Sequence, residues 1–164
     1  MPPQKGFNFN NNINDNNIIE IKDCFYFEQR MNSMIGDNAM YCDYCKQTSN
    51  SSMRTFFATG PEILIIILNR GKGIQFNVKI NFGLELDLSE FIELKQTGCL
   101  YELFGVITHI GESGMSGRFI SYCKDMSTNQ WLKFNDAIVS KVQNFKTEVI
   151  DFAMPYLLFY QQKN

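Results

Sequence analysis

The sequence lacks long apolar runs and clusters of basic residues, and each absence excludes a class of function. The longest uninterrupted apolar run, Ile63 to Leu68, has six residues, whereas a helix that crosses a membrane needs about 20. The formal net charge is −2, and no segment concentrates the Lys and Arg residues that a nucleic-acid-binding surface requires. We therefore expect neither a membrane-spanning segment nor a nucleic-acid partner.

The chain is also poor in histidine, and its cysteines do not form an even set for disulfide cross-links. It has one histidine, His109, and an odd number of cysteines, five. Its first residues contain no apolar stretch of the kind found in a secretion signal. An odd cysteine count without such a signal argues against a disulfide framework. We expect reduced thiols and an intracellular location, either cytoplasmic or nuclear.

Polar residues at the N-terminus divide the chain in two. Seven of the ten residues from Asn8 to Asn17 are asparagine. Such a tract buries too little apolar surface to offset the entropy lost on ordering. Residues 1–17 are therefore predicted to be a disordered, Asn-rich leader, and residues 18–164 to form one globular domain.

The chain as a whole is apolar and aromatic: 45% of its residues are hydrophobic, and its 15 Phe and 7 Tyr suit strands. Short alternating segments separated by turn residues predict mostly antiparallel pairing in an α+β fold. Helical turns are expected over residues 24–31 capped by Asp23, over 89–93 capped by Ser89, and over 136–142. Strands are expected over residues 18–21, 53–58, 63–68, 74–82, 84–88, 101–110, 118–124, 131–134 and 156–160.

One of these strands has an unusual composition. Residues 63–68 are all Ile or Leu and are bounded by Pro61 and Gly71. A continuous β-branched run of this length is typical of a strand with neighbours on both sides and both faces covered. We therefore predict a central, fully buried strand.

Three motifs follow one another near the C-terminus. Tyr-x-Leu-x-x-Val-x-x-His-x-Gly begins at Tyr101, Gly-x-x-x-x-Tyr at Gly117, and Trp-x-x-Phe-Asn-Asp-x-x-Val at Trp131. Together with the cysteine pair at 42–45 and the aromatic ending at 156–160, they closely resemble the ubiquitin-specific proteases, a family of papain-like cysteine deubiquitinases. The resemblance covers about residues 18 to 162. It implies a partial papain-like cysteine proteinase fold, with the fingers and palm present and the helical thumb missing.

The resemblance also implies a catalytic machinery of which this chain holds one half. A cysteine protease needs a thiolate, a base and a group that orients the base. The resembled family draws its nucleophile from a cysteine box near its start, and no such stretch occurs here. Where the family usually has the basic His, this chain has Arg118, which stays protonated and accepts no proton. Asn135 lies seventeen positions further on, so Asn135 and Asp136 are interpreted as the vestigial orienting pair.

The turn between the first two motifs lies, by the same resemblance, beside the channel for the C-terminal tail of ubiquitin. The glycines at 111, 114 and 117 fall between antiparallel strands, which favours a hairpin turn over a phosphate-binding loop. His109 accompanies the catalytic His in the resembled family, so a role as substitute base is the less favoured interpretation. The candidate substrate-binding residues are His109, Gly111, Gly117, Phe119 and Tyr122.

Cys42 and Cys45 have the spacing of half a zinc site, within a tight hairpin over residues 41–46. Structural zinc sites are almost always four-coordinate, and a second cysteine pair is absent. We therefore expect no cofactor, with zinc as the minor alternative.

The sequence as a whole resembles a ubiquitin carboxyl-terminal hydrolase acting in protein deubiquitination. We predict that this chain has no hydrolase activity alone, and that its partner is ubiquitin or a ubiquitinated protein. Three alternatives stay open: a non-catalytic ubiquitin-binding or scaffold pseudoenzyme, the C-terminal part of a longer deubiquitinase, and a small zinc-binding interaction module.

Overall fold

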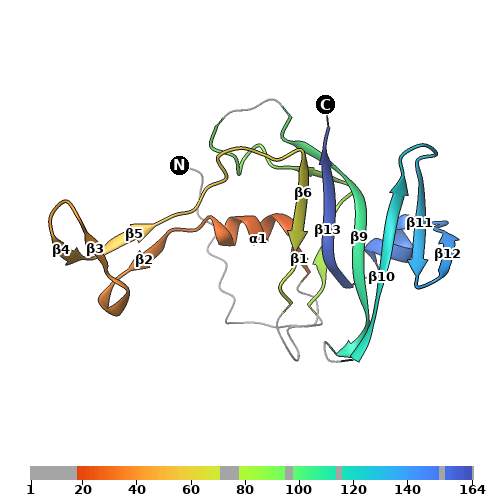
Figure 1. The fold of residues 1–164 in the computed structure, drawn as a ribbon, viewed down its shortest axis with the longest axis horizontal. Helices are drawn as coiled ribbons and strands as arrows, with labels where there is room; N and C mark the ends of the chain where they lie inside the picture. The colour runs from red at the N-terminus through yellow and green to blue at the C-terminus, as the bar shows by residue number, and fades with distance from the viewer. Residues whose placement is uncertain (1–17, 71–77, 95–97, 114–115, 152–153, 164) are drawn as a thin grey trace.

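The computed structural model describes residues 18–70, 78–94, 98–113, 116–151 and 154–163 (Figure 1). The Asn-rich leader predicted over residues 1–17 lies outside this part of the chain, as do residues 74–77 of the strand predicted over 74–82. No helix among the described residues is long and apolar enough to cross a membrane.

A seven-stranded sheet forms the body of the molecule (Figure 1). Its strands follow the order β12-β11-β10-β9-β13-β6, and β8 pairs with β9 beside this path. All of these pairings are antiparallel, which confirms the predicted sheet. The strands are β6 (Ile63–Ile67), β8 (Glu85–Asp87), β9 (Leu100–Ser113), β10 (Ser116–Asp125), β11 (Gln130–Asn135), β12 (Ile138–Lys141) and β13 (Met154–Gln162).

Alternate side chains of the long strands form the core on one face of this sheet. On β10, Tyr122 is 3% exposed, whereas Phe119, which points to the other face, is 55% exposed. The strand register places Val106 opposite Tyr122 and Leu158 opposite Val106, so a buried row crosses three strands. A side-chain period of two therefore decides which motif residues stabilise the fold and which reach the surface.

The one α-helix of the described residues, α1 (Ile21–Glu28), packs against this core through Phe25, whose ring centroid lies 5.3 Å from that of Phe91. The helix begins three residues earlier than predicted, because Asp23 acts from the third helical position. Its carboxylate accepts the backbone N–H of Glu20 at 3.1 Å, one half of a capping box. Before the helix, β1 (Ile19–Glu20) pairs in parallel with β7 (Ile80–Asn81).

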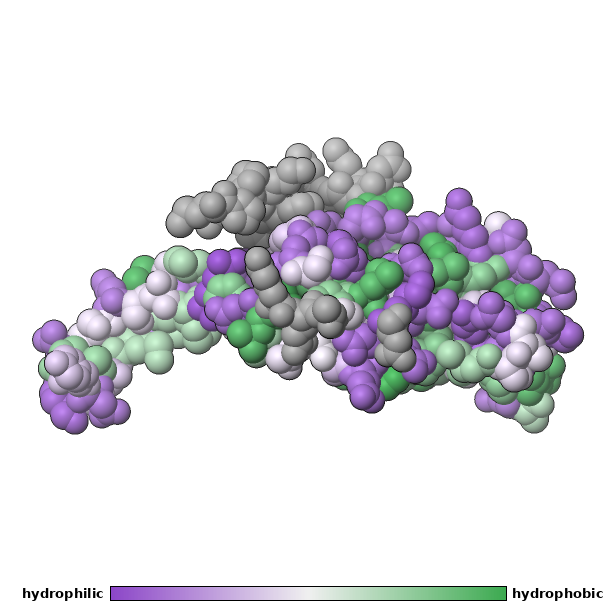
Figure 2. Space-filling model, turned by 90° about the horizontal axis from the view of Figure 1, so that it is seen from above, coloured by the Kyte–Doolittle hydropathy of each residue, from purple (hydrophilic) through white to green (hydrophobic). Residues whose placement is uncertain are grey.

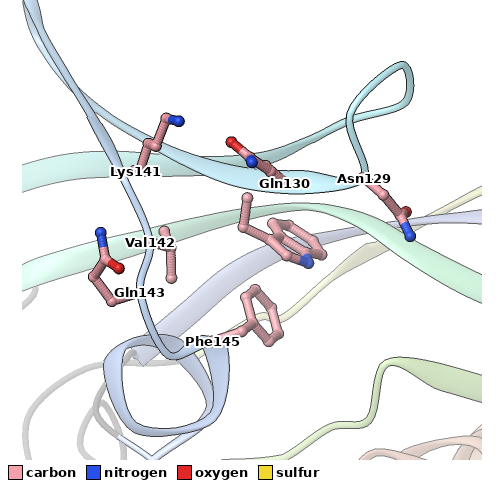
Figure 3. Close-up of a pocket in the computed structure, with 7 residues that line it drawn as sticks. Asn129, Gln130, Lys141, Val142, Gln143 and Phe145 are labelled. Carbon is pink, nitrogen blue, oxygen red and sulfur yellow. The ribbon is translucent and has the colours of Figure 1, made fainter.

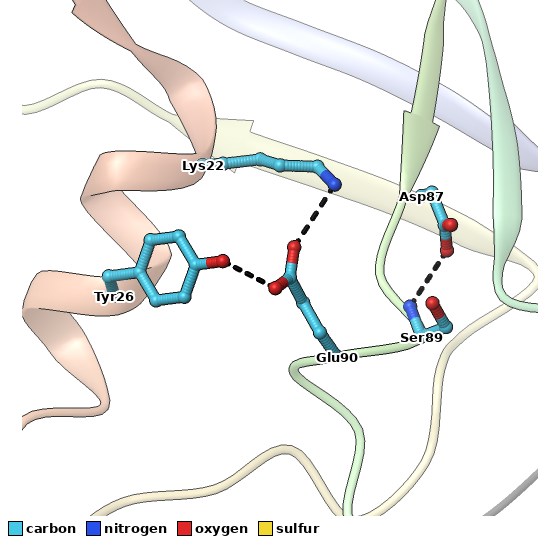
Figure 4. A network of polar contacts seen from close by, with 5 residues as sticks. All are labelled: Lys22, Tyr26, Asp87, Ser89 and Glu90. Atoms are coloured by element: carbon cyan, nitrogen blue, oxygen red, sulfur yellow. Dashed lines mark hydrogen bonds and ion pairs between the residues drawn. The ribbon is translucent and has the colours of Figure 1, made fainter. Parts of the chain in front are cut away.

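A polar network joins α1 to the turn after β8 (Figure 4). Lys22 forms an ion pair with Glu90 at 3.1 Å, and the hydroxyl of Tyr26 donates to the same carboxylate. Asp87 accepts the backbone N–H of Ser89 at 2.9 Å, and this bond lowers the pKa of the Asp87 carboxyl. The predicted helix capped by Ser89 is therefore wrong, because Asp87 closes a turn in its place.

An arm extends from the body at the end of α1 (Figure 1). It is built from two short antiparallel pairs, β2 with β5 and β3 with β4, and the second pair confirms the predicted hairpin over 41–46. In the space-filling view, apolar residues lie along the side of the arm and polar residues gather at its tip (Figure 2). Its elements are β2 (Asn32–Met34), the 3-10 helix η1 (Gly36–Asn38), β3 (Met40–Cys42), β4 (Gln47–Ser49) and β5 (Ser51–Met53).

Two further predicted positions, one strand and one helical turn, are wrong for identifiable reasons. The strand predicted over 53–58 is displaced, because β5 ends at Met53 and only Phe57 forms an isolated bridge, with Ile92. The helical turn predicted over 136–142 is instead β12, because Asp136 adopts φ +54° and turns the chain back along β11. Helical structure follows only afterwards, as the single-turn π-helix η3 (Lys146–Ile150).

The most instructive error concerns β6. It lies at the edge of the sheet rather than in its centre, pairing with β13 alone among the described strands. Ile63, Ile65 and Ile67 are 45%, 52% and 70% exposed, whereas Leu64 and Ile66 pack against the core. An all-apolar run shows no alternation, so its pattern does not reveal which face is covered.

Candidate active site

The three C-terminal motifs lie on adjacent strands, β9, β10 and β11, and the register brings their polar residues together. Arg118 on β10 pairs with Ile110, and Ser121 pairs with Phe134 on β11. Continuing that register by one position sets Asn135 opposite Ile120, on the same face as Arg118. Diagonal neighbours of this kind lie typically about 7–8 Å apart, within reach of a long side chain.

The side chains of Arg118 and Asn135 do not have the chemistry of a general base and the group that orients it. The exposed Arg118 guanidinium has five N–H donors and no acceptor, so it does not abstract a proton. Asn135 Oδ1 is buried and has no hydrogen-bond partner among the described residues. The geometry therefore retains an acceptor for an N–H donor and lacks the imidazole that such an acceptor would orient. Asp136 lies in the following turn with its side chain exposed.

His109 lies on the opposite face of the sheet from Arg118 and Asn135. It pairs with Phe119, and their rings meet edge-on with centroids 5.2 Å apart. Phe119 in turn meets Tyr156 at 5.3 Å, which completes a row of three rings. The imidazole is 7% exposed. Because His109 points away from Asn135, this orienting group does not serve it as a substitute base.

Two glycines permit the close packing of that imidazole. A Cβ on Gly117 would lie 2.5 Å from His109 Cε1 and 2.4 Å from the carbonyl oxygen of Ile110, and the backbone has φ +141°. A Cβ on Gly111 would lie 2.3 Å from the carbonyl oxygen of Ser116. A shift in the ladder between Ser116 and Arg118 marks the same place as a β-bulge. These glycines therefore act in a strand turn.

Of the aromatic candidates, Phe119 reaches the surface and Tyr122 does not. Tyr122 is in the core on the Arg118 face, with Lys133 Nζ 6.0 Å from its ring centroid. Burial raises the pKa of the Tyr122 phenol. A ligand that binds at the exposed surface of the described structure therefore contacts Phe119 rather than the buried Tyr122.

No cysteine among the described residues lies beside Arg118 and Asn135. Cys123 follows on β10 but points to the other face, and burial raises the pKa of its thiol. Burial likewise raises the pKa of Cys24 in α1. A raised thiol pKa leaves little thiolate at neutral pH, so neither has the character of a catalytic nucleophile.

Cys42 and Cys45 lie together in the β3–β4 turn at the tip of the arm. The backbone N–H and thiol of Cys45 lower the pKa of the Cys42 thiol. Lys46, with φ +55°, completes the turn. Among the described residues, no group of three or more His, Cys, Asp or Glu side chains is placed to hold a metal. The pair is therefore half of a zinc site at most, and zinc binding stays a prediction.

A depression lies at the other end of β11 from Asn135 (Figure 3). The rings of Trp131 and Phe145 form its apolar wall, with centroids 4.1 Å apart. Its lining has one cation and several amides but no carboxylate, thiol or imidazole, so it offers no acid–base or nucleophilic chemistry. The residues that line it are Asn129, Gln130, Trp131, Lys141, Val142, Gln143 and Phe145.

Comparison with protein families matches residues 9–160 to the model described as ubiquitin carboxyl-terminal hydrolase. Ubiquitin carboxyl-terminal hydrolase 48 of Danio rerio is 32% identical over 140 residues, which cover 81% of this chain and 13% of that protein. The protein of the same name from Gallus gallus is 30% identical over 137 residues, 79% of this chain and 13% of its own length. The chain thus spans about an eighth of these relatives.

Solved structures agree with this comparison. The SAGA Ubp8/Sgf11/Sus1/Sgf73 DUB module bound to ubiquitin aldehyde contains a chain with TM-score 0.72 and 24% identity, matched over 89% of this chain and 34% of its own. A SAGA DUB module bound to monoubiquitin gives a TM-score of 0.71 and 26% identity, over 89% of this chain and 33% of its own. The described fold corresponds to about a third of those chains.

Proposed function

The chain belongs to the ubiquitin carboxyl-terminal hydrolase family, and from that premise we propose that it binds ubiquitin, or a ubiquitinated protein, without hydrolysing it by itself. The observation that carries the proposal is that Arg118, which we assign to the position of the family's basic His, shares a face of the sheet with Asn135. Matched chains in solved structures are described as bound to ubiquitin aldehyde and to monoubiquitin, which supports the choice of ligand.

The absence of hydrolysis follows from protonation chemistry. Hydrolysis through a thiolate needs a group that takes the thiol proton and later gives it to the leaving amine. A guanidinium does neither near neutral pH, because it stays protonated and has no acceptor. A cysteine supplied by another chain would therefore still lack a base. For the same reason Arg118 argues against this chain being simply the C-terminal half of a conventional deubiquitinase.

The proposal is tested by measuring binding and turnover separately. Titration of isotope-labelled ubiquitin with this protein should shift a contiguous set of ubiquitin amides, and incubation with ubiquitin carrying a fluorogenic C-terminal amide should release no fluorophore. Covalent capture of an electrophilic ubiquitin probe by the unmodified chain would refute the inactive assignment. Unshifted ubiquitin amides at high micromolar protein would refute the binding assignment.

A gain-of-function variant tests the register directly. Arg118→His is combined with a separately supplied cysteine-box half from a relative, and the same mixture with unmodified Arg118 is the control. Turnover is expected only with Arg118→His, and it should fall when Asn135→Ala is added, because the imidazole then loses its orienting acceptor. Equal turnover with Arg118 and with His at this position would show that position 118 is not the base position.

A further inference from the structure

Arg118 is an exposed cation, which gives it chemistry that a neutral histidine base at this position would not have. Arg118 lies where β10 leaves its regular ladder, next to the bulge at Ser116. Asn135 Oδ1, diagonal to it on the same face, is a buried acceptor with no partner among the described residues. A guanidinium offers two usable edges. One edge can serve Asn135 Oδ1 while the other stays directed to solvent.

The immediate surroundings leave that outer edge available. Among the described residues, the ion pairs engage Lys22, Lys46, Lys124 and Lys163, and no carboxylate pairs with Arg118. Asp136, in the turn that follows β11, is in none of these ion pairs either. These surroundings suit an incoming anion.

Access to the guanidinium is also open. Gly117, the residue before Arg118, is exposed, and so is Gly111 on the neighbouring strand. Their missing Cβ positions are directed at His109 and the neighbouring strand, so the part of these glycines that reaches solvent is bare backbone. An extended chain end is therefore the ligand shape that this place admits most readily.

The family name states where on ubiquitin such enzymes act, namely at its carboxyl terminus. A residue in the base position consequently lies beside the terminal carbonyl of bound ubiquitin. When ubiquitin is free, that terminus is a carboxylate, and when ubiquitin is conjugated it is a neutral amide. A planar guanidinium forms paired, charge-assisted hydrogen bonds with a carboxylate that a neutral amide cannot reproduce.

We propose that Arg118 makes this site selective for the free C-terminal carboxylate of ubiquitin, so that the chain prefers released ubiquitin over ubiquitin in amide linkage. The inference rests on the proposed binding of ubiquitin, and it names the chemical form that is bound. Arg118 is the specificity-determining residue, and Asn135, whose Oδ1 has no hydrogen-bond partner among the described residues, lies diagonal to it as an acceptor that one edge of the guanidinium can use when a ligand engages the other edge.

The test compares the affinities of two ligands for the full chain by calorimetry. One is ubiquitin with its native carboxylate, and the other is ubiquitin whose C-terminal carboxylate has been converted to a primary amide. The carboxylate form should bind on the order of ten- to hundredfold more tightly, the range expected for charge-assisted hydrogen bonds. This ratio should shrink as salt rises from about 50 to 300 mM, because the outer edge is exposed.

Variants assign the selectivity to the guanidinium. Arg118→Gln should bring the carboxylate-to-amide ratio close to one, and Arg118→Lys should keep part of it. Lys141→Gln is the matched control, because it removes an exposed cation from the same sheet at the far end of the β11–β12 hairpin. It should leave the ratio unchanged. Arg118 is exposed, so its substitution is expected to preserve the fold, and a thermal melt of each variant verifies this.

The outcomes are distinct. Equal affinity for both forms overturns the carboxylate proposal and leaves ubiquitin binding intact. A ratio that survives Arg118→Gln, or that falls equally in Lys141→Gln, assigns selectivity elsewhere and also overturns it. Failure of both forms to bind overturns the proposed function and this inference with it.

Discussion

Gly60 and Tyr101 offer a test of the core packing in which two substitutions should partly cancel. Tyr101 is 0% exposed, and its hydroxyl donates to the carbonyl oxygen of Pro61 at 2.8 Å. A Cβ on Gly60 would lie 2.3 Å from that hydroxyl oxygen and 3.2 Å from Ile92 Cδ1. The same oxygen atom thus makes the hydrogen bond and excludes a side chain at position 60.

The magnitudes follow from these contacts. Tyr101→Phe removes one hydrogen bond, worth about 0.5–1.5 kcal/mol in the free energy of unfolding. Gly60→Ala forces the hydroxyl away and should cost about 1–3 kcal/mol, as overpacking does. In the Tyr101→Phe background the oxygen is gone and only the movable end of Ile92 is close. There Gly60→Ala should cost close to nothing, because alanine also restricts the unfolded chain by about 0.4–1 kcal/mol.

The coupling between the two sites should therefore be about 1–3 kcal/mol, well above the ~0.3–0.5 kcal/mol scatter of independent sites. Urea unfolding followed by the fluorescence of Trp131, the only tryptophan, measures it. Midpoint shifts convert to free energies if the slope stays constant across the four proteins. In thermal melts, each kcal/mol corresponds to about 2–4 °C for a chain of this size.

Tyr160→Phe is the matched control for this cycle. Its hydroxyl also donates to a backbone carbonyl at 2.8 Å, but that of Gly83, away from Gly60. Gly60→Ala should cost the same with or without Tyr160→Phe. The reasoning is refuted if Gly60→Ala is equally destabilising in the Tyr101→Phe background and in the unmodified chain.

Three further outcomes are expected. Burial raises the pKa of the Tyr160 phenol, so the stability that its neutral form contributes is fully present below the unfolded-state pKa of about 10. The free energy of unfolding should fall as the pH rises above that value. Urea midpoints measured between about pH 8 and 11 should fall less steeply in Tyr160→Phe than in the unmodified chain. Cys42, with its lowered thiol pKa, should react with iodoacetamide faster than Cys24, and peptide mass mapping that found Cys24 modified first would contradict this. Ile65→Lys should reduce concentration-dependent association in light scattering, because it charges the exposed apolar edge of β6, and an unchanged scattering profile would argue against that edge as its cause.

Much of the sheet could be predicted because its C-terminal strands alternate and end at turn residues. The strands predicted over 101–110, 118–124, 131–134 and 156–160 each fall within β9, β10, β11 and β13, which extend one to three residues beyond them at either end. Strand pairing extends past the periodic residues, since backbone hydrogen bonds do not depend on side-chain polarity.

Other elements could not be predicted from local sequence. The uniform Ile/Leu composition of β6 conceals its half-exposed state, because tertiary neighbours alone decide which face is covered. Asp136 adopts a left-handed conformation that turns β11 into β12, and a single residue of this kind leaves only a weak signal in the sequence. The capping role of Asp23 was recognised, but its position in the first turn was not.

For the candidate site, which stays a prediction, the sequence did not indicate how its residues are distributed over the two faces of the sheet. Spacing along the chain indicated that Arg118 and Asn135 belong together, and the register of β10 and β11 is consistent with that. The spacing did not indicate that His109 and Phe119 lie on the opposite face of the sheet from Arg118 and Asn135, because the face that a residue occupies depends on the strand register. The close approach of Gly117 to His109 was likewise not predicted, and the only sign of it in the sequence is that residue 117 is a glycine.

The arm from β2 to β5 has a consequence for how contacts of this protein can be observed. None of its residues from Asn32 to Met53 is buried, so opening it exposes little additional apolar surface. Its backbone amides should therefore exchange with solvent at a free energy far below that of the central strands. Deuterium uptake there is limited by local opening rather than by global unfolding. Any slowing of deuterium uptake in the arm after mixing with another protein then marks the residues which that protein covers, because the fold alone protects the arm only weakly.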